Sequence, residues 1–93
     1  MSAIQVVNND RNSRFEVEQD GDVAYLRYEL RPGKVALIHT EVPEELEGHG
    51  IGSALARAGL DYARANGLKA LVLCPFIQSY LQRHPEYQDI VQA

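Results

Sequence analysis

The sequence predicts one small α+β domain, in which a single layer of mixed, mostly antiparallel sheet carries a βαβ crossover and a C-terminal helix. Residues 14–42 alternate polar and apolar side chains in three runs separated by turn residues. Residues 50–66 change to the spacing of an amphipathic helix, and residues 70–74 are apolar throughout, as in a strand covered on both faces. The 93 residues suffice for one core only, because two cores in this length would bury too little apolar surface to offset chain entropy.

The first half of the chain predicts an antiparallel meander. "RFEVEQ" (14–19) and "VAYLRYEL" (23–30) flank Asp20-Gly21, which is typical of a two-residue hairpin turn because both of its positions need a positive φ. Pro32-Gly33 forms the next turn, before a third strand, "VALIHTEV" (35–42). Upstream, "IQVV" (4–7) is a candidate short strand, and the turn-rich "NNDRNS" separates it from the meander.

The second half predicts the crossover. The helix over 50–66 ends at Asn66-Gly67, where glycine suits a left-handed cap. "ALVLC" (70–74) then reads as a central strand parallel to residues 35–42, which completes a βαβ unit. Pro75 fits the first turn of another helix, which stops before His84-Pro85. The pattern assigns no structure to the tail "EYQDIVQA".

Composition excludes several classes of function. A net charge of −4 and nine scattered basic residues argue against nucleic-acid binding, which needs clustered cations. No apolar run approaches the roughly 20 residues of a membrane span, and the first residues lack a targeting pattern, so a cytoplasmic protein is expected. Cys74 is the single cysteine, and the histidines His39, His49 and His84 lie far apart. We therefore predict neither a disulfide nor a metal site.

The stretch "LEGHGIGSAL" (46–55) is the strongest functional signal, because three glycines precede the predicted helix. Free N–H groups and the positive dipole end of a helix bind phosphate, and ligands of α/β sheets bind outside the carboxyl ends of the parallel strands. The alternative explanation is a tight turn with close helix packing. Common nucleotide loops do not fit, because no Lys lies near the loop and Ser53 stands where G-x-G-x-x-G requires glycine.

This loop resembles the acetyl-CoA signature Q/R-x-x-G-x-G/A of the Gcn5-related N-acetyltransferases. Gly50 and Gly52 match its glycines, whereas Glu47 stands where Gln or Arg is usual. Residues 39–87 also resemble a compact branch of that superfamily, through H-T-x-V-P, G-x-G-I/L, a strand ending in C-P, and Y-L-x-R/K-H/N-P-x-Y. The likeness implies acetyl-CoA as cosubstrate, with a strand bulge near Val42 holding its pantetheine arm. It implies pyrophosphate binding by the segment that begins at Glu47, mainly through the backbone N–H groups of Gly48, His49, Gly50, Ile51, Gly52 and Ser53.

The resemblance further implies that Cys74 and His39 take part in catalysis. A thiol at a helix N-terminus has its thiolate stabilised, and His39 would accept its proton if the two strands are neighbours. The alternatives are an unreactive buried cysteine and a structural histidine, which alternation places on one strand face with Val35 and Leu37. The predicted function is acetyl transfer to a small amine, by an acyl-cysteine or directly. The rival is a non-catalytic acyl-CoA-binding or protein-interaction module.

Other polar residues have two interpretations each. The acidic residues before the helix either form a solvated edge or attract a basic amine; they are Glu44, Glu45 and Glu47. Arg57 either pairs with Asp61 on the helix or reaches a coenzyme phosphate. "NNDRNS" leaves no room for helices that shape an acceptor site, so that site must be shallow or completed by a partner.

Overall fold

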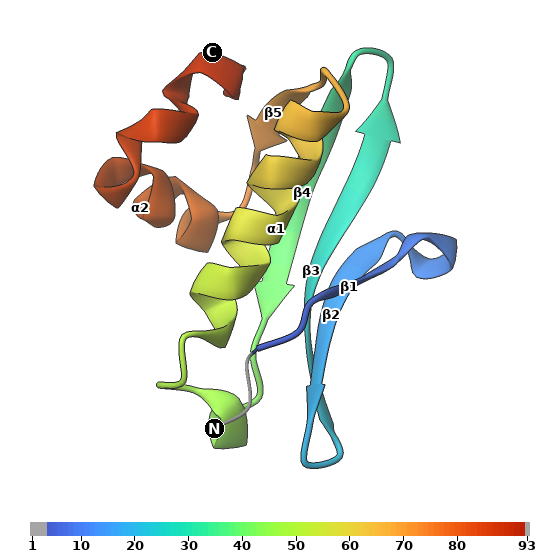
Figure 1. The fold of residues 1–93 in the computed structure, drawn as a ribbon, viewed down its shortest axis with the longest axis vertical. Coiled ribbons are helices and arrows are strands. Elements are labelled where there is room, and N and C mark those ends of the chain that lie inside the picture. Colours follow the sequence, from blue (N-terminus) through green and yellow to red (C-terminus); the bar gives the residue numbers. More distant parts are fainter. Residues whose placement is uncertain (1–3, 93) are drawn as a thin grey trace.

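The computed structural model describes residues 4–92 and confirms the α+β class (Figure 1). A five-stranded sheet has the order β1-β2-β3-β4-β5, with antiparallel neighbours up to β4 and a parallel β4–β5 pair. The strands are β1 (Val7–Asn9), β2 (Arg14–Gln19), β3 (Asp22–Arg31), β4 (Lys34–Glu41) and β5 (Lys69–Val72). The helices are α1 (Ile51–Ala65) and α2 (Pro75–Arg83), with short 3-10 turns η1 (Asp10–Asn12), η2 (Glu44–Leu46) and η3 (Pro85–Ile90).

The meander closes through the predicted turns. Asp20 and Gly21 have φ values of 54° and 83°, as the two-residue hairpin requires. The first strand, however, covers Val7–Asn9 rather than residues 4–7. Side chains explain this shift, because the Tyr28 hydroxyl donates to the Asn8 side chain over 2.7 Å and the Asn9 side chain caps η1.

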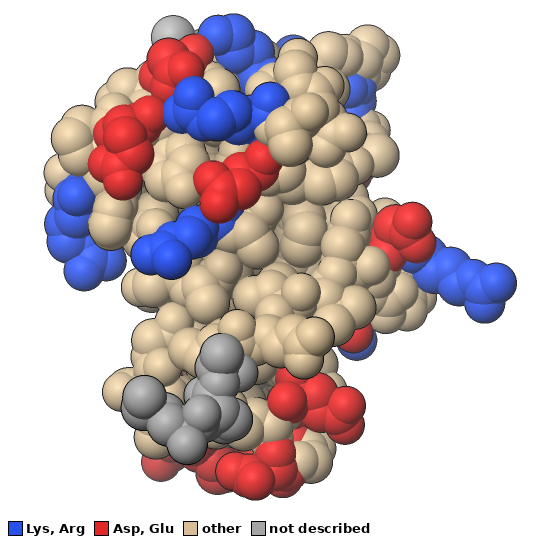
Figure 2. All heavy atoms as spheres, in the orientation of Figure 1, with Lys and Arg blue, Asp and Glu red and all other residues tan. Residues whose placement is uncertain are grey.

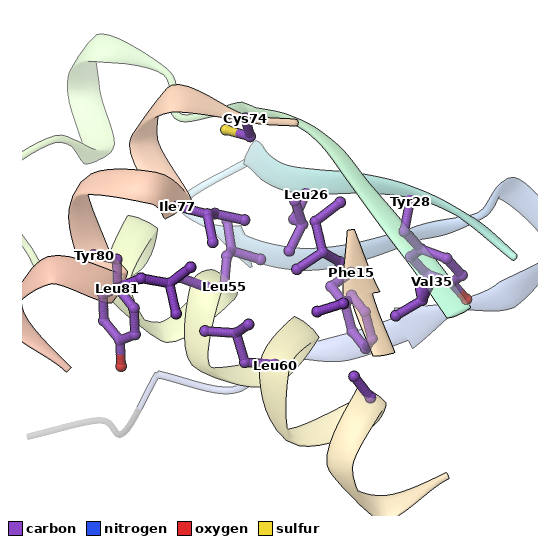
Figure 3. Packing of buried hydrophobic residues seen from close by; sticks show 14 of the residues in the cluster. Phe15, Leu26, Tyr28, Val35, Leu55, Leu60, Cys74, Ile77, Tyr80 and Leu81 are labelled. Carbon is purple, nitrogen blue, oxygen red and sulfur yellow. The ribbon is translucent and has the colours of Figure 1, made fainter. Parts of the chain in front are cut away.

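Helix α1 crosses the sheet and buries its apolar face against it. Figure 3 shows side chains of the sheet, of α1 and of α2 meeting in one core, among them Phe15, Leu26, Leu55, Leu60 and Ile77. Gly59 of α1 allows a close approach, because a Cβ at this position would lie 2.8 Å from Leu26 Cδ2. None of the helices in residues 4–92 is long and apolar enough to cross a membrane.

Strand β5 is parallel to β4, as predicted, but it lies at the edge of the sheet and not at its centre. Its outer side is covered by the tail, since Val91 forms a parallel bridge with Ala70 and the Gln92 N–H donates to the Ala70 carbonyl over 2.9 Å. The tail thus adopts structure that periodicity did not reveal, because η3 is short and is held by contacts distant in sequence. Arg64 donates to both carboxylate oxygens of Asp89, at 3.0 and 2.9 Å.

A β-bulge at Ile38 changes which residues of β4 face the helices. Leu37 lies opposite Tyr28 and His39 lies opposite Arg27, so Ile38 has no partner on β3. The prediction that His39 shares a face with Leu37 is therefore wrong, because the extra residue reverses the alternation. Thr40 lies opposite the buried Leu26 and faces the core in place of His39.

Candidate functional site

A cleft of about 550 Å³ opens where β4 extends beyond β5. The β4–β5 ladder ends at Leu37 and Val72, whereas β4 continues to Glu41. The cleft lies between this end of β4, the loop after η2, the beginning of α1 and one side of α2. It is lined by Thr40, Glu41, Val42, Leu46, Glu47, Gly48, Gly50, Ile51, Gly52, Ser53, Phe76 and Arg83.

The three glycines of the loop are required for two different reasons. Gly48 and Gly50 have φ values of 83° and 77°, a left-handed conformation that side chains disfavour. Gly52 is helical instead, and a Cβ there would lie 2.7 Å from Phe76 Cζ of α2. The first two glycines shape the loop, and the third allows α2 to pack on the first turn of α1.

The loop presents a row of unused donors at the N-terminus of α1. The first hydrogen bond of the helix runs from the Ala54 N–H to the Gly50 carbonyl, over 3.0 Å. Within residues 4–92, the N–H groups of positions 48–53 therefore have no acceptor. Together with the positive end of the helix dipole, these donors can bind an anion that enters the cleft.

Carboxylates surround this donor row. Glu44, Glu45 and Glu47 are all exposed, and of the three only Glu47 lines the cleft. Figure 2 shows mainly acidic side chains at the end of the molecule that carries η2 and the loop. Arg83 is the single cation among the lining residues. An anionic ligand would thus meet backbone donors and one guanidinium in a rim that is otherwise negative.

Cys74 caps α2, beside the wall of the cleft. Its side chain is 3% exposed, and Pro75 follows as the first helical residue. The Thr40 hydroxyl lies 3.3 Å from the Cys74 sulfur, within hydrogen-bonding distance. Since Thr40 lines the cleft, this contact connects the thiol to the space in which a ligand would lie.

His39 is not beside Cys74. It lies on the sheet face opposite the helices, where its side chain is 57% exposed and its Nε2 is 3.0 Å from Glu41 Oε1. The Tyr25 ring meets the imidazole edge to face, at 6.3 Å between centroids. The structure therefore does not form the expected Cys74–His39 pair, and the catalytic role of His39 stays a prediction.

The remaining candidates divide between the cleft and the body of the protein. The structure brings Val42, Glu47, Gly48, Gly50, Ile51, Gly52 and Ser53 together along the cleft. The His49 side chain is exposed and does not line it. Tyr80 is buried and stacks on His84 at 4.0 Å. Within residues 4–92, no three potential metal-ligating side chains lie together.

Sequence reasoning missed five of the residues that line the cleft, namely Thr40, Glu41, Leu46, Phe76 and Arg83. Thr40 was hidden by the bulge, which no alternation pattern reveals. Phe76 and Arg83 are seven residues apart, or about two helical turns, so they lie on the same side of α2. That spacing indicates a shared face of α2, but it points to the cleft only together with the packing of α2 against α1.

Comparisons with known proteins place this site in a family context. The model of a family described as GCN5-related N-acetyl-transferase matches residues 14–90. Protein NATD1 of Xenopus tropicalis is 39% identical over 87 residues, which cover 90% of this chain and 80% of that protein. Protein NATD1 of Mus musculus is 41% identical over 83 residues, or 85% and 76% of the two chains. The solution structure of a GCN5-like protein from Staphylococcus aureus matches with a TM-score of 0.75 and 28% identity, covering 100% of this chain and 92% of that one.

Proposed function

The chain belongs to the GCN5-related N-acetyltransferase family, and from this premise we propose that it binds acetyl-CoA in the cleft and transfers the acetyl group to a small amine. The row of free N–H groups at positions 48–53 carries the proposal. These donors lie beside a cleft of about 550 Å³, which is within the usual range for a small-molecule site.

Three parts of the coenzyme can be assigned to surfaces of the cleft. The pyrophosphate would accept hydrogen bonds from the loop N–H groups, because a helix N-terminus combines donors with positive potential. The pantetheine arm would run along the end of β4 toward Val42, where β5 no longer pairs with β4. The acetyl group would then lie near Thr40 and Cys74.

Cys74 is the proposed acyl carrier. Its sulfur would attack the acetyl carbonyl, forming a new thioester while the bond to the CoA sulfur breaks, and the thiol proton would pass to the departing CoA thiolate. An amine would then attack this thioester, forming the amide and returning a proton to Cys74. Cys74 is the N-cap of α2, so its sulfur lies beside the positive end of the helix dipole.

A non-catalytic acyl-CoA-binding module is the second candidate. The 3% exposure of Cys74 favours it, since a nucleophile must be reached by its substrate. In that case the cleft binds the coenzyme, and the thiol serves only in packing.

Intact-mass measurement separates these candidates. Incubation with acetyl-CoA should add about 42 Da, the mass of one acetyl group replacing a proton, and Cys74→Ala should abolish the adduct. Coenzyme binding with neither adduct nor amine acetylation would identify the module.

The location of binding needs its own test. Ser53→Glu places a carboxylate in the first turn of α1, which the helix dipole tolerates but which would repel a phosphate. We expect coenzyme binding measured by calorimetry to be lost in this variant. The control is Gln88→Glu in η3, which adds the same charge at an exposed residue that does not line the cleft. Full affinity in Ser53→Glu would exclude this loop as the phosphate site.

A further inference from the structure

We propose that Arg83 binds a phosphate group of the CoA nucleotide and supplies the positive charge that the loop lacks. The proposal rests on acetyl-CoA binding in the cleft and names an additional contact for it. Arg83 is exposed and lines the cleft from α2.

Packing between the two helices places this residue. Phe76 lies so close to Gly52 that a Cβ at position 52 would contact three atoms of its ring, at 2.7 to 3.4 Å. This contact holds one side of α2 against the first turn of α1. Arg83 follows Phe76 by about two turns, and helical residues at this spacing share a face. Both side chains line the cleft as a result.

Arg83 is also available for a ligand. Arg14, Arg31 and Arg64 form ion pairs with carboxylates. Within residues 4–92, Arg83 has neither an ion pair nor a side-chain hydrogen bond. Arg57 of α1 differs from Arg83 in its surroundings, because Tyr80 raises the pKa of the Arg57 guanidinium.

The negative charge beside the loop favours a cation in the cleft. Glu41 and Glu47 both line it, and Glu47 occupies the position where the acetyl-CoA signature has Gln or Arg. A phosphate approaching the loop is therefore repelled by the Glu47 carboxylate and attracted by backbone dipoles, whereas the Glu41 carboxylate is 3.0 Å from His39 Nε2 on the opposite face of the sheet. A guanidinium offers a planar fork of donors that matches phosphate oxygens, and Arg83 can offset this repulsion.

Calorimetry with three probes tests the proposal: CoA, 3′-dephospho-CoA and pantetheine, which has no phosphate. We expect Arg83→Gln to raise the Kd of CoA about tenfold or more, because a charge-assisted hydrogen bond is lost. Arg11→Gln makes the same charge change in η1, far from the cleft, and should leave the Kd unchanged. The affinity for pantetheine should be equal in all three proteins.

The possible outcomes distinguish failure of the Arg83–phosphate contact from failure of coenzyme binding in the cleft. If Arg83→Gln weakens CoA but not 3′-dephospho-CoA, the guanidinium binds the 3′-phosphate; if it weakens both, it binds the diphosphate. Unchanged CoA affinity in Arg83→Gln, or an equal loss in Arg11→Gln, would overturn the role of Arg83 and leave the proposed function standing. A wild-type protein that binds no CoA would instead refute the proposed function.

Discussion

The Thr40 hydroxyl lies 3.3 Å from the Cys74 sulfur, joining the end of β4 to the residue that caps α2. The two residues are 34 positions apart in the chain. Their contact forms at the point where β4 and β5 stop pairing, beside the cleft. A hydroxyl in this position can donate a hydrogen bond to a thiolate. An unprotonated imidazole nitrogen can only accept one.

We predict that the hydroxyl of Thr40 supports acylation of Cys74. Thr40→Val keeps the shape of the side chain but removes the hydrogen bond, whereas Thr40→Ser keeps the hydroxyl. Acetylation of Cys74 by acetyl-CoA, followed by intact mass, should slow about tenfold in the valine variant, the scale of one hydrogen bond to a charged group. The serine variant should stay within about threefold of wild type.

His39→Gln is the comparison that this prediction needs. Because the His39 ring lies on the opposite face of the sheet and contacts Glu41, its loss should leave the acetylation rate of Cys74 unchanged. A large fall in His39→Gln, with no fall in Thr40→Val, would restore the histidine as the proton acceptor and reject Thr40.

The limits of sequence reasoning follow from single residues. Asp20-Gly21 fixed the hairpin in advance because only a few residue types adopt both of its backbone conformations. Ile38, in contrast, gives no local signal of its bulge, yet it reverses the face of every later residue in β4. Alternation consequently places His39 on the same face as Leu37, whereas in the structure Thr40 faces the core.

The sequence correctly predicts a loop before the helix, but the three glycines of this loop are needed for different reasons. A positive φ at Gly48 and Gly50 follows local rules that a sequence carries. The need for glycine at position 52 comes from Phe76, which is 24 positions later and belongs to another helix. Contacts of this kind depend on how α1 and α2 pack, and periodicity within either helix does not contain that information.

Removing the charge of Glu47 should tighten coenzyme binding. Glu47→Gln removes the negative charge of a residue that lines the cleft and places an amide at the signature position. We expect the Kd of CoA to fall about fivefold, as for the loss of a partly screened repulsion of about 1 kcal/mol. Glu45→Gln is the control, since that side chain is exposed but does not line the cleft. Equal tightening in both variants would indicate a general effect of net charge.

The tail should loosen at high pH through Tyr87. Its hydroxyl donates to Asp61 over 2.7 Å, and burial together with this carboxylate raises the pKa of Tyr87 to about 12. Because the folded pKa exceeds the unfolded value of about 10, the associated stability is complete below pH 10 and is lost as the pH rises from 10 toward 12.

Tyr87→Phe should therefore lower the free energy of unfolding by about 1 kcal/mol at pH 7. In thermal denaturation, raising the pH to 11 should then destabilise this variant less than it destabilises the wild type. Some loss of stability at high pH should remain in Tyr87→Phe, because burial also raises the pKa of Tyr28. Tyr25→Phe is the control, since its ring contacts Arg14 but its hydroxyl has no hydrogen bond within residues 4–92. The same alkaline loss in wild type and Tyr87→Phe would show that Tyr87 does not titrate as described.

Two glycine-to-alanine changes in α1 should have different effects, although both create a Cβ closer than 3.0 Å to a neighbour. At Gly59 the neighbours are Leu26 and Leu37, which are fully buried. Packing strain of about 1 to 3 kcal/mol should therefore exceed the gain in helix propensity, which is up to about 1 kcal/mol. At Gly52 the neighbour is Phe76, whose side chain is 40% exposed and can rotate into solvent. Urea denaturation should show a clear loss in Gly59→Ala and a change within about 0.5 kcal/mol in Gly52→Ala. An equal loss in the two variants would mean that Phe76 is held as firmly as the core, and that the wall of the cleft is rigid at this point.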